Sequence, residues 1–250
     1  MQWVDLSPLE FLLVFIGAAG IGFSKSGFAG VGMIHVLIFA FVFGARQSTG
    51  ILLPMLVVGD IFAVRLFGAE VQWPYVRRLL VPATIGVLIG WLMMDHLDET
   101  TFKPLIGAII LALTLMQIAR MWRPRLFDHL PHTLWFAWSL GLLAGVTTML
   151  ANAAGPIIAL YLIAVALPKY QLIGTSAWFF LVLNVLKLPF SAALGLIDFG
   201  TLVLNATFAP AVALGMVAGR WLVRRVPQRL FDTILLLLTA VVALRLIGCF

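Results

Sequence analysis

The sequence GIGFSKSGFAGVG, from Gly20 to Gly32, lies between two short apolar runs and decides the fold class. The runs, Phe11 to Phe23 and Val31 to Phe43, hold 13 residues each, whereas a helix that crosses a bilayer needs about 20. At about 1.5 Å per residue, each run would cover about 20 Å of a hydrocarbon core about 30 Å thick. The glycine-rich link is therefore expected within the membrane, where free backbone groups are tolerated only inside protein or beside a wet cavity.

The composition excludes an ordinary soluble domain. The 250 residues are 63% hydrophobic and only 10% charged, whereas about 25% of the residues of a soluble domain are charged. We therefore predict an all-α, polytopic membrane protein with about 8 to 10 hydrophobic segments. The single cysteine, Cys249, excludes an intrachain disulfide and a cysteine-based metal site. The acidic N-terminus lacks a basic region, so no cleaved signal peptide is expected.

The pattern of apolar segments occurs twice. Each half contains an interrupted pair followed by three longer segments, at 11–43, 48–67, 76–94 and 103–119, and again at 134–167, 172–197, 202–223 and 231–248. Residues at separations of 124 to 129 match, as in Gly20/Gly145, Gly30/Gly155, Asp60/Asn184, Pro82/Pro210, Gly86/Gly215, Gly90/Gly219 and Phe102/Phe231. This indicates an internal duplication into two membrane repeats, 1–125 and 126–250, of one integrated transmembrane domain. The GxxxG pairs in this series are typical of close helix contacts.

The distribution of basic residues decides how the two repeats are related. An odd number of crossings per half gives an inverted repeat, whereas four crossings per half give a parallel one. Under odd parity one side collects 11 basic residues, Arg65, Arg77, Arg78, Arg120, Arg123, Arg125, Lys169, Arg220, Arg224, Arg225 and Arg229, against 3 on the other, Arg46, Lys103 and Arg245. The parallel count splits them 7 against 7. Because cytoplasmic loops are enriched in Lys and Arg, we expect inverted repeats, a cytoplasmic 120–125 loop and both termini outside the cytoplasm.

Inverted repeats with interrupted helices are typical of secondary transporters, whose substrate site lies where the broken helices of both halves meet. The second half-helices are expected to start near Gly27 and Ala153, with their N-termini directed inward as anion sites. Hydroxyl, amide and ammonium groups at both links are suitable donors to a small oxyanion. The residues expected to bind the anion are Ser24, Lys25, Ser26, Gly27, Phe28, Thr148, Asn152 and Ala153.

Two other interpretations of these links stay open. The glycines could serve only close helix packing, with the hydroxyls bonded to nearby backbone. Lys25 could lie in a cytoplasmic loop if both short runs cross the membrane.

Ionisable residues inside apolar segments are functional candidates, because they are expensive to bury in a membrane. Asp60 lies in the third segment, and Lys187 lies three residues after Asn184, which matches Asp60 in the repeat. Lys187 could add positive potential to the site and Asp60 could accept a proton. Alternatively, Asp60 and Lys187 form a structural pair, or Lys187 reaches an interface. His35 is either a proton relay or a hydrogen-bonded core residue.

The sequence resembles the TauE/SafE family of membrane transporters, named for sulfite export. The resemblance rests on GFSKSGFAGVG near the N-terminus, its degenerate second copy TTMLANAAGP, the small size and the duplicated halves, and it covers almost the whole chain. It implies a permease of the bacterial inner membrane that moves sulfite, sulfonates or related sulfur-containing or organic anions. Members often have a denser glycine run in the first link, whereas Phe28, Ala29 and Val31 interrupt it here.

We therefore expect a secondary transporter that exports small anions by alternating access. Its export could be coupled to protons. The alternative is a passive anion channel on the same fold. Phosphate-loop and metalloenzyme motifs are absent from the sequence, so neither an enzyme nor a bound cofactor or metal is expected. The expected partners are the small anion and the lipid bilayer, and a homodimer is compatible with the sequence. The basic residues lie in loops between apolar runs, which indicates membrane orientation and not nucleic acid.

Overall fold

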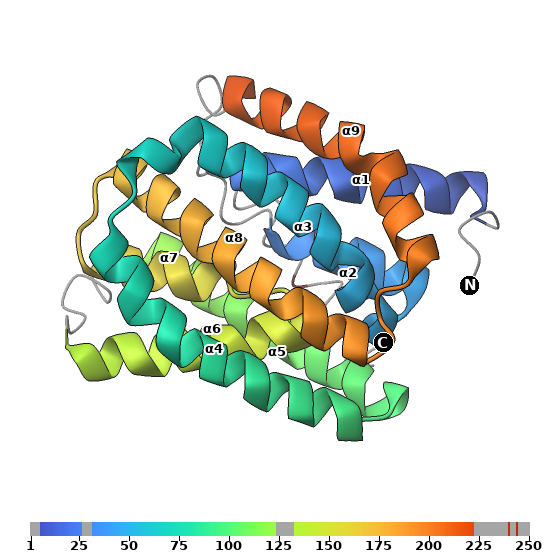
Figure 1. Cartoon of the computed structure of the whole chain (residues 1–250), viewed down its shortest axis with the longest axis horizontal. Helices are drawn as coiled ribbons and strands as arrows, with labels where there is room; N and C mark the ends of the chain where they lie inside the picture. Colours follow the sequence, from blue (N-terminus) through green and yellow to red (C-terminus); the bar gives the residue numbers. More distant parts are fainter. Residues whose placement is uncertain (1–5, 27–31, 124–132, 223–239, 241–243, 245–250) are drawn as a thin grey trace.

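The computed structural model describes residues 6–26, 32–123, 133–222, 240 and 244. In these ranges it contains one short 3-10 helix, η3, and nine α-helices (Figure 1). The elements are α1 (Pro8–Lys25), α2 (Gly32–Phe43), α3 (Ala45–Phe67), η3 (Gly68–Glu70), α4 (Trp73–His96), α5 (Glu99–Trp122), α6 (Leu134–Ala151), α7 (Gly155–Ala164), α8 (Lys169–Ala193) and α9 (Phe199–Leu222). Strands are absent from the described ranges. The prediction of an all-α protein is confirmed.

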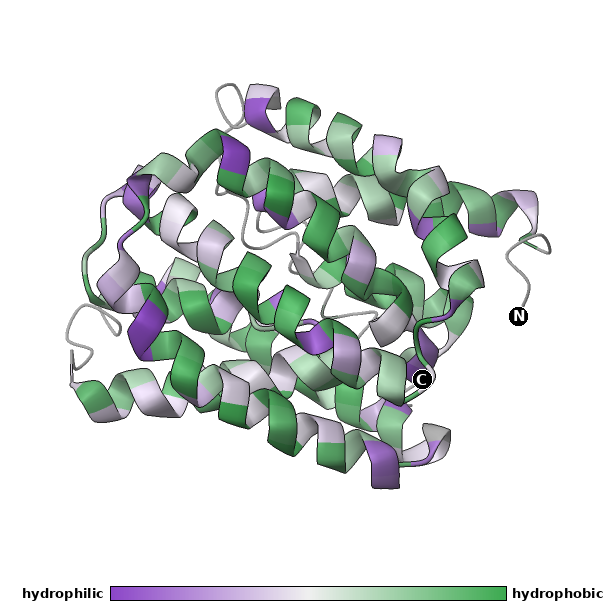
Figure 2. Cartoon of the chain, in the orientation of Figure 1, coloured by the Kyte–Doolittle hydropathy of each residue, from purple (hydrophilic) through white to green (hydrophobic). Residues whose placement is uncertain are grey.

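Seven of these helices are long and apolar enough to cross a membrane: α1, α3 with η3, α4, α5, α6, α8 and α9. Figure 2 shows hydrophobic residues along the lengths of the helices and hydrophilic residues mostly at helix ends and connections. Large apolar side chains such as Leu92, Phe199 and Val217 are exposed to the surroundings, as expected of a surface that faces lipid. The chain is therefore a polytopic membrane protein.

Side-chain caps start several helices at the positions that the sequence dictates. Ser7 and Glu10 form a reciprocal capping box at the start of α1, and Pro8 occupies its first turn. Asp98 accepts a hydrogen bond from the Thr101 backbone N–H at the start of α5. Hydrogen bonds from Thr101 hold the pKa of Asp98 below its ordinary value. Each cap satisfies backbone donors that the first turn leaves unpaired.

The structure corrects the expected length of the first helix in the first interrupted pair, which was predicted to have 13 residues. The first helix of each pair, α1 or α6, has 18 residues and counts among the candidate spans. The second helix is short, with 12 residues in α2 and 10 in α7. The polar residues expected to end the first helices remain helical because their hydroxyls donate to backbone carbonyls one turn back, Ser24 to Ile21 at 2.8 Å and Thr147 to Leu143 at 2.8 Å.

Of the two second half-helices, α7 starts later than predicted. The expected start at Gly27 lies outside the described residues, and the described part of α2 begins at Gly32. Helix α7 begins at Gly155 instead of Ala153, because Asn152 takes a left-handed conformation (φ 51°) that ends α6.

Two helix pairs hold the described part of the structure together, α1 against α9 and α4 against α6 (Figure 1). Each pair joins a helix of the first half to a helix of the second, so the halves interlock. Glycines allow the backbones to touch: a Cβ at Gly215 would overlap the Ala19 carbonyl, and one at Gly86 would overlap the Leu142 carbonyl. The GxxxG interpretation as close helix contact is confirmed for both pairs.

The glycine contacts between α4 and α6 are equivalent to those between α1 and α9, as expected if the two halves arose by duplication. Gly145 faces the Ala83 carbonyl, and Gly22 faces the carbonyl of Val212, the residue that corresponds to Ala83 in the second half. Gly22, and not Gly20, therefore occupies the place of Gly145 in the packing, and the sequence match was two residues off. A Cβ at Gly20 would make only ordinary contact, 3.7 Å from the Cβ of His35.

The inverted orientation of the repeats stays a prediction, as does the division at 125/126, which falls in a segment outside the described residues. The expected segment 231–248 and Cys249 also lie outside the described residues, apart from 240 and 244.

Replacing Gly215 with Ala should destabilise the protein, because the added methyl group would force α9 away from α1. We expect a loss of about 1 to 3 kcal/mol, the range for overpacked positions. Gly155→Ala is the matched control, since a Cβ there would have no described neighbour within 4 Å. Thermal unfolding of the purified protein in detergent measures both, and equal midpoints for the two variants would contradict the packing described.

Candidate functional site

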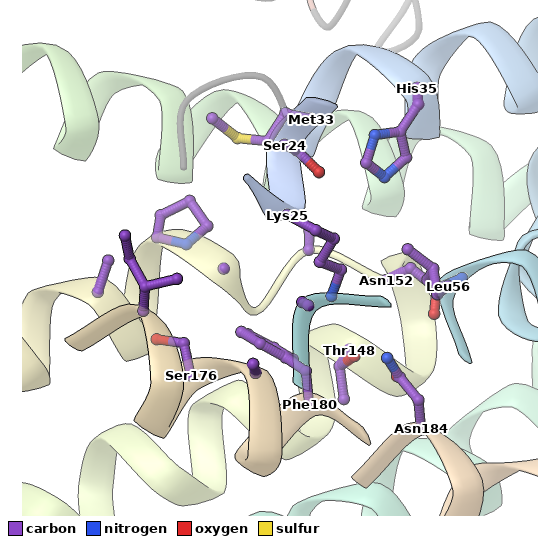
Figure 3. Close-up of a pocket in the computed structure, with 18 of the residues that line it drawn as sticks. Ser24, Lys25, Met33, His35, Leu56, Thr148, Asn152, Ser176, Phe180 and Asn184 are labelled. Atoms are coloured by element: carbon purple, nitrogen blue, oxygen red, sulfur yellow. The ribbon is translucent and has the colours of Figure 1, made fainter. Parts of the chain in front are cut away.

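The polar residues of both links meet at a cavity of about 130 Å³ in the middle of the described helices (Figure 3). Its walls come from α1, α2, α3, α7, α8 and the connection between α6 and α7. Most of the lining is apolar, as in Met33, Leu56 and Phe180. The polar residues of the lining are Ser24, Lys25, His35, Thr148, Asn152, Ser176 and Asn184. An apolar pocket with a few convergent polar groups is the usual form of a small-molecule site.

Lys25 is the last residue of α1, and its ammonium forms an ion pair with Asp60 of α3 at 2.5 Å. The Asp60 side chain is fully buried, and that of Lys25 is 14% exposed. Asn184 of α8 donates from Nδ2 to the other carboxylate oxygen at 2.7 Å. The Lys25 Nζ also lies 4.5 Å from the centre of the Phe180 ring, a cation–π contact. The interpretation of Lys25 as a residue of a solvated loop is therefore wrong.

Lys187 is almost completely buried, with 1% of its surface exposed. Its ammonium donates to the Thr148 carbonyl at 2.7 Å, to the Thr148 hydroxyl at 3.2 Å and to Asn152 Oδ1 at 2.6 Å. These three bonds use all three protons of the ammonium. The expected Asp60–Lys187 pair is wrong, because Asp60 pairs with Lys25. The alternative in which Lys187 reaches an interface is wrong because the side chain is buried.

The break between α6 and α7 is built around Asn152. Its left-handed backbone ends α6, its Nδ2 donates to the Thr49 carbonyl of α3 at 2.9 Å, and its Oδ1 accepts from Lys187. The Asn152 backbone N–H donates to the Thr148 carbonyl at 3.0 Å. Ala153 and Gly155 border the cavity, so the N-terminus of α7 lies at its edge.

Two buried polar atoms at the cavity have no hydrogen-bond partner among the described residues. They are Nδ1 of His35, which lies in the first turn of α2, and Oδ1 of Asn184. Both residues line the cavity and are 3% and 2% exposed. Because an unsatisfied buried polar atom costs about 1 to 3 kcal/mol, a molecule in the cavity that hydrogen-bonds these atoms would be favoured.

The structure brings together most of the expected site residues. Ser24, Lys25, Thr148, Asn152 and Ala153 line the cavity together with His35 and Asn184, while Asp60 and Lys187 lie directly behind them. Ser26 does not line this cavity, because its hydroxyl donates to the Phe23 carbonyl and its side chain packs against Gly219 of α9. Gly27 and Phe28 lie outside the described residues.

The sequence analysis missed Ser176 and Phe180, which line the cavity from α8. They precede Asn184 by eight and four residues, so all three lie on one face of the helix. This periodicity, extended back from Asn184, could have identified them.

The matching family model is that of the sulfite exporter TauE/SafE, and it covers residues 13–246. The chain belongs to the TauE/SafE family. Comparison with curated proteins and with solved structures finds no match. TauE/SafE proteins are membrane transporters, which agrees with the seven candidate spans and with a central cavity between the broken helices.

In this TauE/SafE protein the groups around the cavity carry an excess of positive charge. Lys25 and Lys187 contribute two ammonium groups, and Asp60 is the one carboxylate in contact with them in the described part of the chain. The partners of Lys187 are neutral, so they satisfy its hydrogen bonds without compensating its charge. No group of three or more His, Cys, Asp or Glu side chains suited to a metal occurs in the described ranges.

Removing one member of the Lys25–Asp60 pair should lower the stability of the protein more than removing both. Lys25→Met leaves a fully buried carboxylate without its cation, and we expect a loss of about 3 to 5 kcal/mol of stability. In Lys25→Met/Asp60→Asn most of this loss should disappear, because no buried charge is left unpaired. Thermal unfolding in detergent compares the two, and a double variant no more stable than the single one would contradict the pairing.

Proposed function

We propose that this protein is a secondary transporter that exports small anions, such as sulfite, organosulfonates or related sulfur-containing or organic anions, by alternating access. The observation that carries the proposal is the cavity lined by Lys25, with the buried Lys187 and the buried Asp60 directly behind its lining residues. Family membership supports a transporter of this kind.

An anion in the cavity would compensate the charge that the protein leaves unbalanced. At about 5 Å and an effective dielectric constant of about 20, one pair of unit charges attracts by about 3 kcal/mol. Lys25 would contact the anion because it lines the cavity, and Asn152 beside it has a second N–H on Nδ2 to donate. Ser24 would donate to the anion once its hydroxyl turns away from the Ile21 carbonyl. Lys187 would act through its field from behind the Asn152 side chain. The apolar remainder of the lining would accept a short organic group.

Proton coupling would use the Lys25–Asp60 pair. A proton on Asp60 would release the Lys25 ammonium for the anion, so proton binding and anion binding would favour one another. Proton and anion would then leave the cell together, driven by a higher anion concentration in the cytoplasm. His35 is the other titratable residue in the cavity wall, and its unpaired Nδ1 would accept a proton or a hydrogen bond. We assign the main coupling role to Asp60 because it contacts the cation that the anion needs.

The proposed topology follows the basic residues. The 120–125 loop would lie in the cytoplasm of a bacterium and both termini outside it, with the two repeats inverted in the inner membrane. Alternating access would then rock one broken-helix unit against the other around the central cavity. A passive anion channel is the second candidate; its flux would fail to saturate as anion concentration rises.

A thermal-shift panel of sulfite, sulfate, thiosulfate, taurine, sulfoacetate and simple carboxylates tests the proposal. A ligand at about 100 times its dissociation constant should add about 2.7 kcal/mol of stability. Lys25→Met/Asp60→Asn should bind the responding anion more weakly by about 1.5 to 3 kcal/mol, because it loses a charge-assisted contact.

Arg65→Ala is the control for this panel, since it removes an exposed positive charge outside the cavity. Equal affinity in the double variant and in this control would place the anion elsewhere. For a sulfonate, whose own charge does not change, wild-type affinity should increase at mildly acidic pH, and Asp60→Asn should remove this dependence. A dependence that persists in Asp60→Asn would move the coupling role to another group.

A further inference from the structure

A second, larger cavity of about 580 Å³ lies beside the central one. The elements that border it are the end of α3 with η3, the first turn of α8, the last turn of α9 and Ser26 at the end of α1. Its charged lining residues are Lys169, Arg220 and Glu70, so it carries one net positive charge. Neither cation has an ion pair or hydrogen bond within the described ranges.

The wall that carries Lys169 is held in place by close contacts. A Cβ at Gly174 would overlap the Phe67 carbonyl, so α8 packs directly on the end of α3. The Gln72 backbone N–H donates to the Thr175 hydroxyl at 3.0 Å, and the Trp178 indole donates to the Gly68 carbonyl at 3.2 Å. The first turn of α8 therefore has a fixed position between the two cavities.

Arg220 is held on the opposite wall. Its neighbour Gly219 packs so closely on α1 that a Cβ there would overlap the Ser26 hydroxyl. Arg220 is therefore close to the end of α1, where Ser26, the residue after Lys25, also lines the second cavity. The first turn of α8, which has no side-chain cap, adds the positive end of its dipole to the wall that carries Lys169.

The two cavities share Ile173 as a lining residue. Ser24 and Lys25 line the central cavity, and Ser26, the next residue, lines the second one. The Ile173 side chain, near the start of α8, therefore lies at the boundary between the second cavity and the central cavity.

We infer that the second cavity is an access vestibule that holds a small oxyanion, such as a sulfonate, at Lys169 and Arg220 before the anion passes Ile173 into the central cavity. The inference rests on the proposed function only in that the central cavity receives an anion. Clefts lined by charge of one sign concentrate ions of the opposite sign and raise their rates of arrival by about 10-fold or more. Glu70 offsets one of the two cations and leaves one net positive charge in the cavity.

Cysteine labelling tests the vestibule without requiring a known substrate. Ser176→Cys in a Cys249→Ser background places one thiol in the central cavity. The probes are two methanethiosulfonates of similar size, one with a sulfonate and one with a trimethylammonium group. Replacing Lys169 and Arg220 together with Gln should lower the ratio of sulfonate to ammonium labelling rates by about 10-fold. Arg65→Gln, at the same end of α3 but outside both cavities, should leave the ratio unchanged.

The role of Ile173 has its own comparison. Ile173→Trp should slow labelling of Ser176→Cys by both reagents and leave Ala69→Cys, in the second cavity, unaffected. An unchanged ratio in the double Gln variant would overturn the anion site, and equal labelling of Ser176→Cys with and without Ile173→Trp would overturn the route. An unreactive Ser176→Cys beside a reactive Ala69→Cys would also overturn the route.

The labelling result is independent of the thermal-shift panel of anions. If the double Gln variant lowers the ratio of sulfonate to ammonium labelling rates but no anion stabilises the protein or crosses the membrane, the proposed function fails and the vestibule remains. If anions bind at Lys25 and the double Gln variant leaves the ratio of labelling rates unchanged, only the vestibule fails. Labelling in inside-out vesicles alone would place the second cavity on the cytoplasmic side, where the basic residues predict it.

Discussion

The burial of two ammonium groups with a single carboxylate is the constraint on which this structure depends. Charged side chains inside a membrane protein cost at least about 3 kcal/mol each unless protein or water compensates them. Lys25 has Asp60 as its counterion, whereas Lys187 has only neutral oxygen partners. The helices around it must therefore supply carbonyl, hydroxyl and amide oxygens at fixed positions.

The broken helices meet this requirement. At the end of α6 the left-handed turn at Asn152 points a side-chain oxygen and the Thr148 carbonyl at Lys187. The glycine contacts between α1 and α9 and between α4 and α6 bring the helices that end at the cavity into direct backbone contact. Backbone contact at the glycines holds the helices together, and the helix ends at the breaks supply the polar groups. Stability and binding therefore depend on different parts of the same helices.

The sequence was sufficient to predict the helical class, the long segments and the convergence of both links on one site. Those features depend on local composition and on a repeated pattern. The choice of partner for Asp60 was not predictable, because Lys25 and Lys187 both lie in apolar parts of the sequence and only the packing of α1 against α3 brings Lys25 to 2.5 Å from Asp60. The orientation of the Ser26 side chain was also not predictable from the sequence, because it depends on the close approach of α9 at Gly219. The length of α1 was underestimated because hydroxyls bonded to the backbone, such as that of Ser24, keep a polar turn helical.

The most direct test of the account is to locate an anion in the protein. Selenite has the shape and charge of sulfite and contains a strong anomalous scatterer, so crystals of the protein soaked in selenite would show where the oxyanion binds. The account predicts a selenium peak in the central cavity, within contact distance of the Lys25 ammonium and close to Asn152 and Asn184. Selenium peaks only at surface sites, in a protein that transports selenite, would contradict it.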